Sequence, residues 1–261
     1  MVGPQLYKYL DFEGGLRMLE NSNLQFTNAT RLNDPFDCTN DLIDFSNVPA
    51  ERCKNWPPNI IKELESSYYR NLRKKIWMCS LSKVYDELLM WGYYSSHRGI
   101  CIGLDIEKVE QYLGHVWCGG PFIGAQKMEV QYKDIFDKPD FFHNMGITDF
   151  FNYQLSTKSN AWEHEQEVRL LLVDPAIGLI PPGYSKEDQK EDGSVDSKDV
   201  HFYSILGREC FNELYLGVQM NKNKQDEIID VARSLNPKMK IYRMTVDSDS
   251  FRLKPRFIDF D

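Results

Sequence analysis

The chain has 261 residues, 42% of them hydrophobic and 27% charged, which is typical of a globular protein and not of a disordered one. Its net charge of -8 argues against a general nucleic-acid binder, which normally carries a basic face. No stretch is apolar for the length of a membrane span, and the first residues lack the basic and apolar regions of a secretory signal. The six cysteines form no Cys-x-x-Cys pair. We therefore expect reduced cysteines and a cytoplasmic protein that does not bind membranes.

Short strands and helices alternate through the first half of the chain. Alternating or continuous apolar residues predict strands at 5–10, 24–27, 76–80 and 100–104. Apolar residues at helical spacing predict helices at about 14–19, 59–72, 86–95 and 105–113. Aromatic and apolar residues of the 86–95 helix, among them Met90, Trp91 and Tyr94, are more typical of a core than of a ligand platform.

A polar loop separates the second strand from the 59–72 helix. Its sequence is Arg-Leu-Asn-Asp-Pro-Phe-Asp at 31–37, and Asn and Asp before a proline favour a turn. One interpretation is a rigid turn in which Phe36 plugs the core. The other is that Asn33, Asp34 and Asp37 line a cleft, because polar loop residues often carry function.

The second half of the chain has the same mixed character. Strands are predicted at 128–132, 200–206, 213–218 and 240–244, with an edge strand at 251–254, and helices at 148–156 and 224–235. Residues 181–199 are almost all polar or charged and predict a mobile acidic surface insertion. Because strands and helices interleave unevenly, we expect a single α+β domain over 1–261, with a mixed, partly antiparallel sheet and interspersed helices.

The most informative stretch runs from Trp162 to Val173. Its end, Leu-Leu-Leu-Val, predicts a buried strand, and alternation leading into that strand places Glu165, Glu167 and Arg169 on one face. Two carboxylates and a guanidinium on a core strand are costly unless they are paired or used. Structural pairing and a functional site remain equally open at this point.

Several of these residues together resemble an uncharacterised, mainly bacterial family, domain of unknown function 2971. The resemblance covers residues 6 to 173 and rests on an ordered set: Tyr7-Lys8-Tyr9, Asn33-Asp34-Pro35-Phe36-Asp37, Cys79-Ser80, Leu89-Met90-Trp91, Tyr94, Gly99, Lys158, Trp162, Glu165, Glu167 and Arg169. It implies a boundary for the fold but no established activity.

A second resemblance is to the ADP-ribosyltransferase superfamily, in which a Ser/Thr-x-Ser strand end precedes a strand opened by Glu-x-Glu or Gln-x-Glu. Ser80-Leu81-Ser82 and Glu165-Gln166-Glu167 follow that order, although the first strand offers Lys8 where those enzymes use Arg or His. The resemblance implies cleavage of NAD, with Glu167 stabilising charge on the ribose and Glu165 orienting or deprotonating the acceptor. It also implies that Lys8 and Ser80 contact the cofactor, and that Trp91 or Tyr94 stacks on nicotinamide.

Three hypotheses follow. The first is an NAD-using transferase, in a toxin or in phage defence, acting on a small nucleotide or a macromolecular target, and it requires Glu167, Ser80 and Lys8 in one cleft. The second is a metal-dependent hydrolase or nuclease, with magnesium or manganese held by carboxylates among Asp34, Asp37, Glu165 and Glu167. The third is a non-catalytic binding or sensing module in which Arg169 and Lys8 hold an anion, and a free Arg169 that faces the pocket would favour it.

Overall fold

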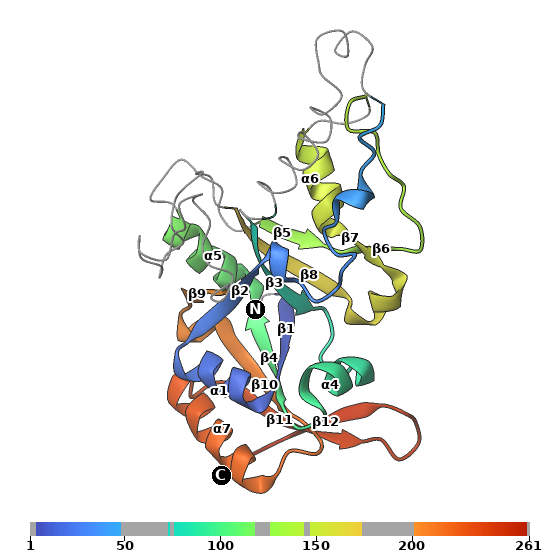
Figure 1. The fold of residues 1–261 in the computed structure, drawn as a ribbon. Coiled ribbons are helices and arrows are strands. Elements are labelled where there is room, and N and C mark those ends of the chain that lie inside the picture. The colour runs from blue at the N-terminus through green and yellow to red at the C-terminus, as the bar shows by residue number, and fades with distance from the viewer. Residues whose placement is uncertain are drawn as a thin grey trace.

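The computed structural model describes residues 4–47, 73, 76–117, 126–143, 147–173 and 201–259 (Figure 1). Its α-helices are α1 (Phe12–Glu20), α4 (Leu88–Ser95), α5 (Ile106–Trp117), α6 (Ile147–Ser156) and α7 (Lys222–Leu235). Its 3-10 helices are η1 (Ala29–Arg31), η2 (Asn40–Leu42), η3 (Asn160–Glu165) and η5 (Arg208–Cys210). Its strands are β1 (Gln5–Leu10), β2 (Asn23–Asn28), β3 (Ile76–Ser82), β4 (Ile100–Asp105), β5 (Gln126–Glu129), β6 (Gln131–Lys133), β7 (Thr157–Ser159), β8 (Glu167–Val173), β9 (His201–Ile205), β10 (Phe211–Leu216), β11 (Lys240–Val246) and β12 (Leu253–Phe257).

One large sheet organises the fold and confirms the predicted α+β class. Its strand order is β12-β11-β10-β4-β1-β3-β2-β9, and β8 pairs with both β3 and β5. The β10–β11 pair is parallel, whereas the other pairs of this sheet are antiparallel. A second, two-stranded parallel sheet joins β6 to β7.

Strand β3 changes its neighbour along its length, and this change opens the sheet. One edge of β3 pairs with β8 over the whole strand. On the other edge, Met78 pairs with Thr27 of β2, but Ser82 pairs with Tyr7 of β1. Between these two pairings the carbonyl of Ser80 accepts a hydrogen bond from Lys8 Nζ at 2.9 Å. A side chain thus satisfies a backbone group where β3 passes from one partner strand to the other.

The two faces of the large sheet carry different coverings. Helices α1, α5 and α7 supply Leu19, Val109 and Ile228 to the main core, and their apolar faces repeat at helical spacing. Helix α4 lies on the opposite face, where Trp91 packs in a smaller cluster with Tyr9. Figure 1 shows α1 and α7 together on one side of the strands and α4 on the other.

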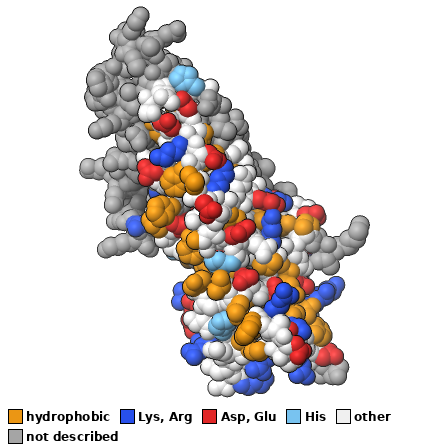
Figure 2. All heavy atoms as spheres, turned by 90° about the vertical axis from the view of Figure 1, so that its right-hand side faces the viewer, with side chains coloured by type: hydrophobic (Ala, Val, Ile, Leu, Met, Phe, Trp, Pro, Cys, Tyr) orange, Lys and Arg blue, Asp and Glu red, His pale blue; other side chains and the backbone are white. Residues whose placement is uncertain are grey.

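Outside the core, charged side chains of both signs are interspersed with hydrophobic ones on the face shown in Figure 2. Within the described part of the chain, no helix is long and apolar enough to cross a membrane.

Most predicted elements are found within a few residues of their expected bounds. The predicted strand 128–132 is instead two strands, because the chain leaves β8 at Val130 and then pairs with β7. The prediction that Glu165 lies on the same strand as Glu167 is wrong: Glu165 ends η3, and Gln166 adopts a left-handed conformation (φ 43°) before β8 begins. The predicted 59–72 helix and 181–199 insertion lie outside the described residues.

Candidate functional site

Arg169 is the centre of a buried ionic network. Its side chain is fully buried on β8, and its Nη1 and Nη2 atoms donate to both carboxylate oxygens of Asp37 at 2.9 and 2.7 Å. Its Nε and Nη2 atoms donate to the two oxygens of Glu167 at 2.9 and 3.2 Å. Nη1 also donates to the carbonyl of Leu155 at 2.7 Å. The planar guanidinium therefore satisfies two carboxylates by paired hydrogen bonds, a geometry that lysine cannot supply.

Lys158 extends the network to a second glutamate. It lies on β7, is buried, and donates to Glu165 at 2.5 Å and to Glu167 at 2.9 Å. The other oxygen of Glu165 accepts a hydrogen bond from Tyr94 on α4 at 2.5 Å. Because Gln166 turns the chain between η3 and β8, both glutamates point toward Lys158 although they do not share a strand face.

The electrostatics of the network keep Glu167 charged. Burial by itself raises the pKa of Glu167, but the positive charges of Arg169 and Lys158 and hydrogen bonds from Arg169 and Ser80 hold that pKa far below the ordinary glutamate value of 4.5. Burial likewise lowers the pKa of Lys158, yet the two glutamates outweigh burial and raise it. The carboxylate and the ammonium group are both ionised at neutral pH.

A small pocket opens onto this network. Its volume is about 60 Å³, and we call it the carboxylate pocket; its lining residues are Tyr7, Lys8, Tyr9, Ser80, Leu81, Ser82, Met90, Tyr94, Glu165 and Glu167. The pocket lies where β1 and β3 part, so Lys8 and Ser80 meet the two glutamates there. The side chain of Tyr94 is 38% exposed, and burial together with the charge of Glu165 raises its pKa.

Of the residues predicted to contact a ligand, Lys8, Ser80, Tyr94, Glu165 and Glu167 are brought together in the carboxylate pocket. Trp91 does not line this pocket, because its ring is fully buried and its Nε1 donates to the carbonyl of Tyr85; of the two aromatic residues expected to stack on nicotinamide, Tyr94 lines the pocket. Arg169 and Asp37 are also not available to a substrate, since each binds the other in the interior.

The remaining predicted residues belong to the 31–37 loop. Asp34 is 5% exposed, and its Oδ1 accepts the backbone N–H of Phe36 at 2.9 Å, as in an Asx turn. Asn33 is exposed and lies in neither pocket-lining set. The interpretation of Phe36 as a plug of the core is wrong, because its ring is 60% exposed.

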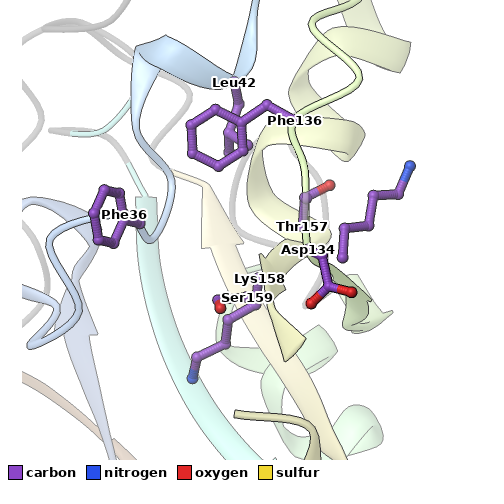
Figure 3. Close-up of a pocket in the computed structure, with 8 residues that line it drawn as sticks. Phe36, Leu42, Asp134, Phe136, Thr157, Lys158 and Ser159 are labelled. Atoms are coloured by element: carbon purple, nitrogen blue, oxygen red, sulfur yellow. The ribbon is translucent and has the colours of Figure 1, made fainter. Parts of the chain in front are cut away.

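Phe36 instead borders a second cavity, of about 180 Å³ (Figure 3). We call it the ring pocket, and its described lining residues are Phe36, Leu42, Lys133, Asp134, Phe136, Thr157, Lys158 and Ser159. Lys158 lines this cavity and also bonds the two glutamates of the carboxylate pocket. Lys158 is one of the residues that carry the family resemblance, but the sequence analysis gave it no role in the site.

Among the described residues, no group of three or more His, Cys, Asp or Glu side chains is arranged to hold a metal ion. The carboxylates proposed as metal ligands have other partners: Asp37 and Glu167 bind Arg169, and Glu165 binds Lys158. The donor set of a hard divalent cation, several oxygens converging on one point, is not assembled there.

Comparison of the chain with models of protein families, with curated proteins and with solved structures finds no match.

Proposed function

We propose that the protein is an NAD-using enzyme similar to ADP-ribosyltransferases and that the carboxylate pocket is its active site. The observation that carries this proposal is that Glu165 and Glu167, joined by Lys158, line one pocket with Lys8 and Ser80. The transferase hypothesis required Glu167, Ser80 and Lys8 in one cleft. The binding-module hypothesis would be favoured by a free Arg169, whereas Arg169 binds Asp37 and Glu167.

The charge state of the network suits this chemistry. In NAD cleavage the bond between ribose C1′ and the nicotinamide nitrogen breaks, and the electron pair leaves with the nitrogen, so positive charge builds on the sugar. Glu167 is held ionised and fixed in place by Arg169, so it stabilises that charge without reorganising. The acceptor oxygen, or water, forms the new bond to C1′ and releases a proton, which Glu165 is placed to receive.

The small size of the carboxylate pocket implies that it must widen before a substrate can enter. A volume of about 60 Å³ is well below that of an engineered cavity of about 150 Å³ that holds a benzene ring, so the pocket as it stands is too small to enclose a sugar ring. Tyr94 forms part of the wall, is partly exposed, and is held by its hydrogen bond to Glu165. We therefore propose that Tyr94 swings outward on α4 when the ribose binds.

We further propose that the chain belongs to the family of domain of unknown function 2971. We also propose that it acts in a toxin or in phage defence. A cytoplasmic location fits an enzyme that consumes NAD. It also fits the four described cysteines, Cys38, Cys79, Cys101 and Cys210, which are all free thiols.

The test is release of nicotinamide from NAD, measured chromatographically with and without candidate acceptors such as nucleotides and whole-cell protein. We expect Glu165→Gln and Glu167→Gln to lower the rate by a hundredfold or more, as loss of general acid–base or charge-stabilising groups does. Glu129→Gln is the matched control, because Glu129 is an exposed glutamate paired with Lys83. Thermal unfolding of each variant separates loss of activity from loss of fold.

No nicotinamide release by the wild-type protein under any of these conditions contradicts the proposal. If the Glu165→Gln variant is folded and its activity is undiminished, the proposed role of Glu165 in the mechanism is contradicted.

A further inference from the structure

Phe36 is an exposed aromatic residue on a rigid turn. Asp34 accepts the N–H of Phe36 through Oδ1, and the N–H of Asp37 donates to the carbonyl of Asp34 at 3.1 Å. The Asp37 carboxylate is in turn fixed by two hydrogen bonds from Arg169. A ring that is 60% exposed is thus held in place from both sides, which lowers the entropic cost of using it to bind a ligand.

The ring pocket beside Phe36 has the size of one aromatic ring. Its volume of about 180 Å³ is close to that of an engineered apolar cavity of about 150 Å³ that binds benzene. Phe36 and Leu42 come from the segment after β2, and Phe136 comes from the segment after β6. In Figure 3 the rings of Phe36 and Phe136 stand apart from each other, and Lys158 points away from Phe136.

The polar groups of the ring pocket favour a cationic ring. Asp134 is exposed and has no ion-pair partner within the described part of the chain, whereas Lys133 is paired with Asp137. The ammonium group of Lys158 is neutralised by Glu165 and Glu167. A positively charged ring gains cation–π attraction from the phenylalanine faces and Coulomb attraction from Asp134.

We infer that the ring pocket binds a positively charged, single aromatic ring: the pyridinium end of NAD. The identity of the ring rests on the proposed function, while its size and charge rest on the pocket. Lys158 lines the ring pocket and bonds both glutamates of the carboxylate pocket, so one residue links the proposed ring site to the ionised carboxylates.

Binding of 1-methylnicotinamide, a cation, and of nicotinamide, its neutral counterpart, tests this inference by titration calorimetry on the intact protein. We expect the cation to bind at least fivefold more tightly. Phe36→Leu keeps an apolar side chain without a π face and should weaken binding of the cation at least fivefold. Asp134→Asn should weaken binding of the cation but not of nicotinamide.

Phe251→Leu is the control, because Phe251 is a fully exposed phenylalanine beyond β11, outside the ring-pocket lining. Equal binding of the cation to wild type and to Phe36→Leu overturns the inference, as does no binding at millimolar concentration. The same variants in the NAD assay separate the two proposals. If the enzyme is active and Phe36→Leu leaves the KM for NAD unchanged, the inference about the ring pocket is contradicted but the proposed function is not. If the cation binds in a Phe36-dependent manner but NAD is not cleaved, the ring pocket is supported and the transferase function is contradicted.

Discussion

The two faces of strand β8 differ in its first half, before Leu171 returns the charged face to apolar packing. Val168, Leu170 and Leu172 point into the main apolar core, whereas Glu167 and Arg169 point into the ionic network. Both faces are buried, with Leu170 and Arg169 each 0% exposed. The apolar face stabilises the fold by removing hydrocarbon from water. The charged face carries a desolvation cost of several kcal/mol per ion, which its hydrogen bonds offset only if every partner is present. The difference indicates that one face serves stability and the other serves the site.

Removing the central cation should have the largest effect. Arg169→Leu leaves Asp37 and Glu167 as buried carboxylates without their main partner, so we expect a loss of about 3–5 kcal/mol in the free energy of unfolding, measured by urea denaturation. The triple variant Asp37→Asn, Glu167→Gln, Arg169→Leu should recover part of this loss, because no unpaired charge remains. A triple variant less stable than Arg169→Leu alone would contradict this account.

Truncation on the apolar face should cost slightly less. Leu170→Ala removes buried methyl groups from the main core and leaves a cavity, so we expect a loss of about 3 kcal/mol in the same measurement. Unlike the changes on the charged face, it should leave the charge of the carboxylate pocket intact. Nicotinamide release by the folded fraction should therefore match that of the wild type. A specific loss of activity in this variant would show that the two faces are not separable.

The smallest effect on the free energy of unfolding should come from lowering the pH. The folded-state pKa of Glu167 lies far below its ordinary value of 4.5, because Arg169 and Lys158 outweigh burial. The corresponding stability is therefore complete above about pH 4.5 and is lost progressively as the pH falls below it. Urea denaturation at a series of pH values should show a fall that is shallower in Glu167→Gln. Leu170→Ala should follow the wild-type slope, and an unchanged slope in Glu167→Gln would contradict the assignment.

Much of the fold was predictable because it depends on local periodicity. Strand β8 follows from its apolar run, and helix α7 follows from Ile228, Ile229 and Ala232 at helical spacing. The position of Glu165 was not predictable in this way. Strict alternation places it beside Glu167, whereas the left-handed turn at Gln166 ends η3 and moves Glu165 off the strand.

The candidate site was predicted in composition but not in arrangement. The sequence indicated that Glu165, Glu167 and Arg169 must be paired or used, because charges on a buried strand are costly. It did not indicate that Arg169 takes Asp37, which is 132 residues away, as its second partner. It also did not assign Lys158 as the group that joins the two glutamates.

The sequence by itself determined most of the described helices and strands, and that β8 carries charges into the interior, because these depend on the order of apolar and polar residues. Only the tertiary structure decided which charges meet. The change of partner along β3 brings Lys8 to Ser80 and opens the carboxylate pocket, and the Asp34 turn turns Phe36 outward. Such choices depend on contacts between residues far apart in the chain, which periodicity does not encode.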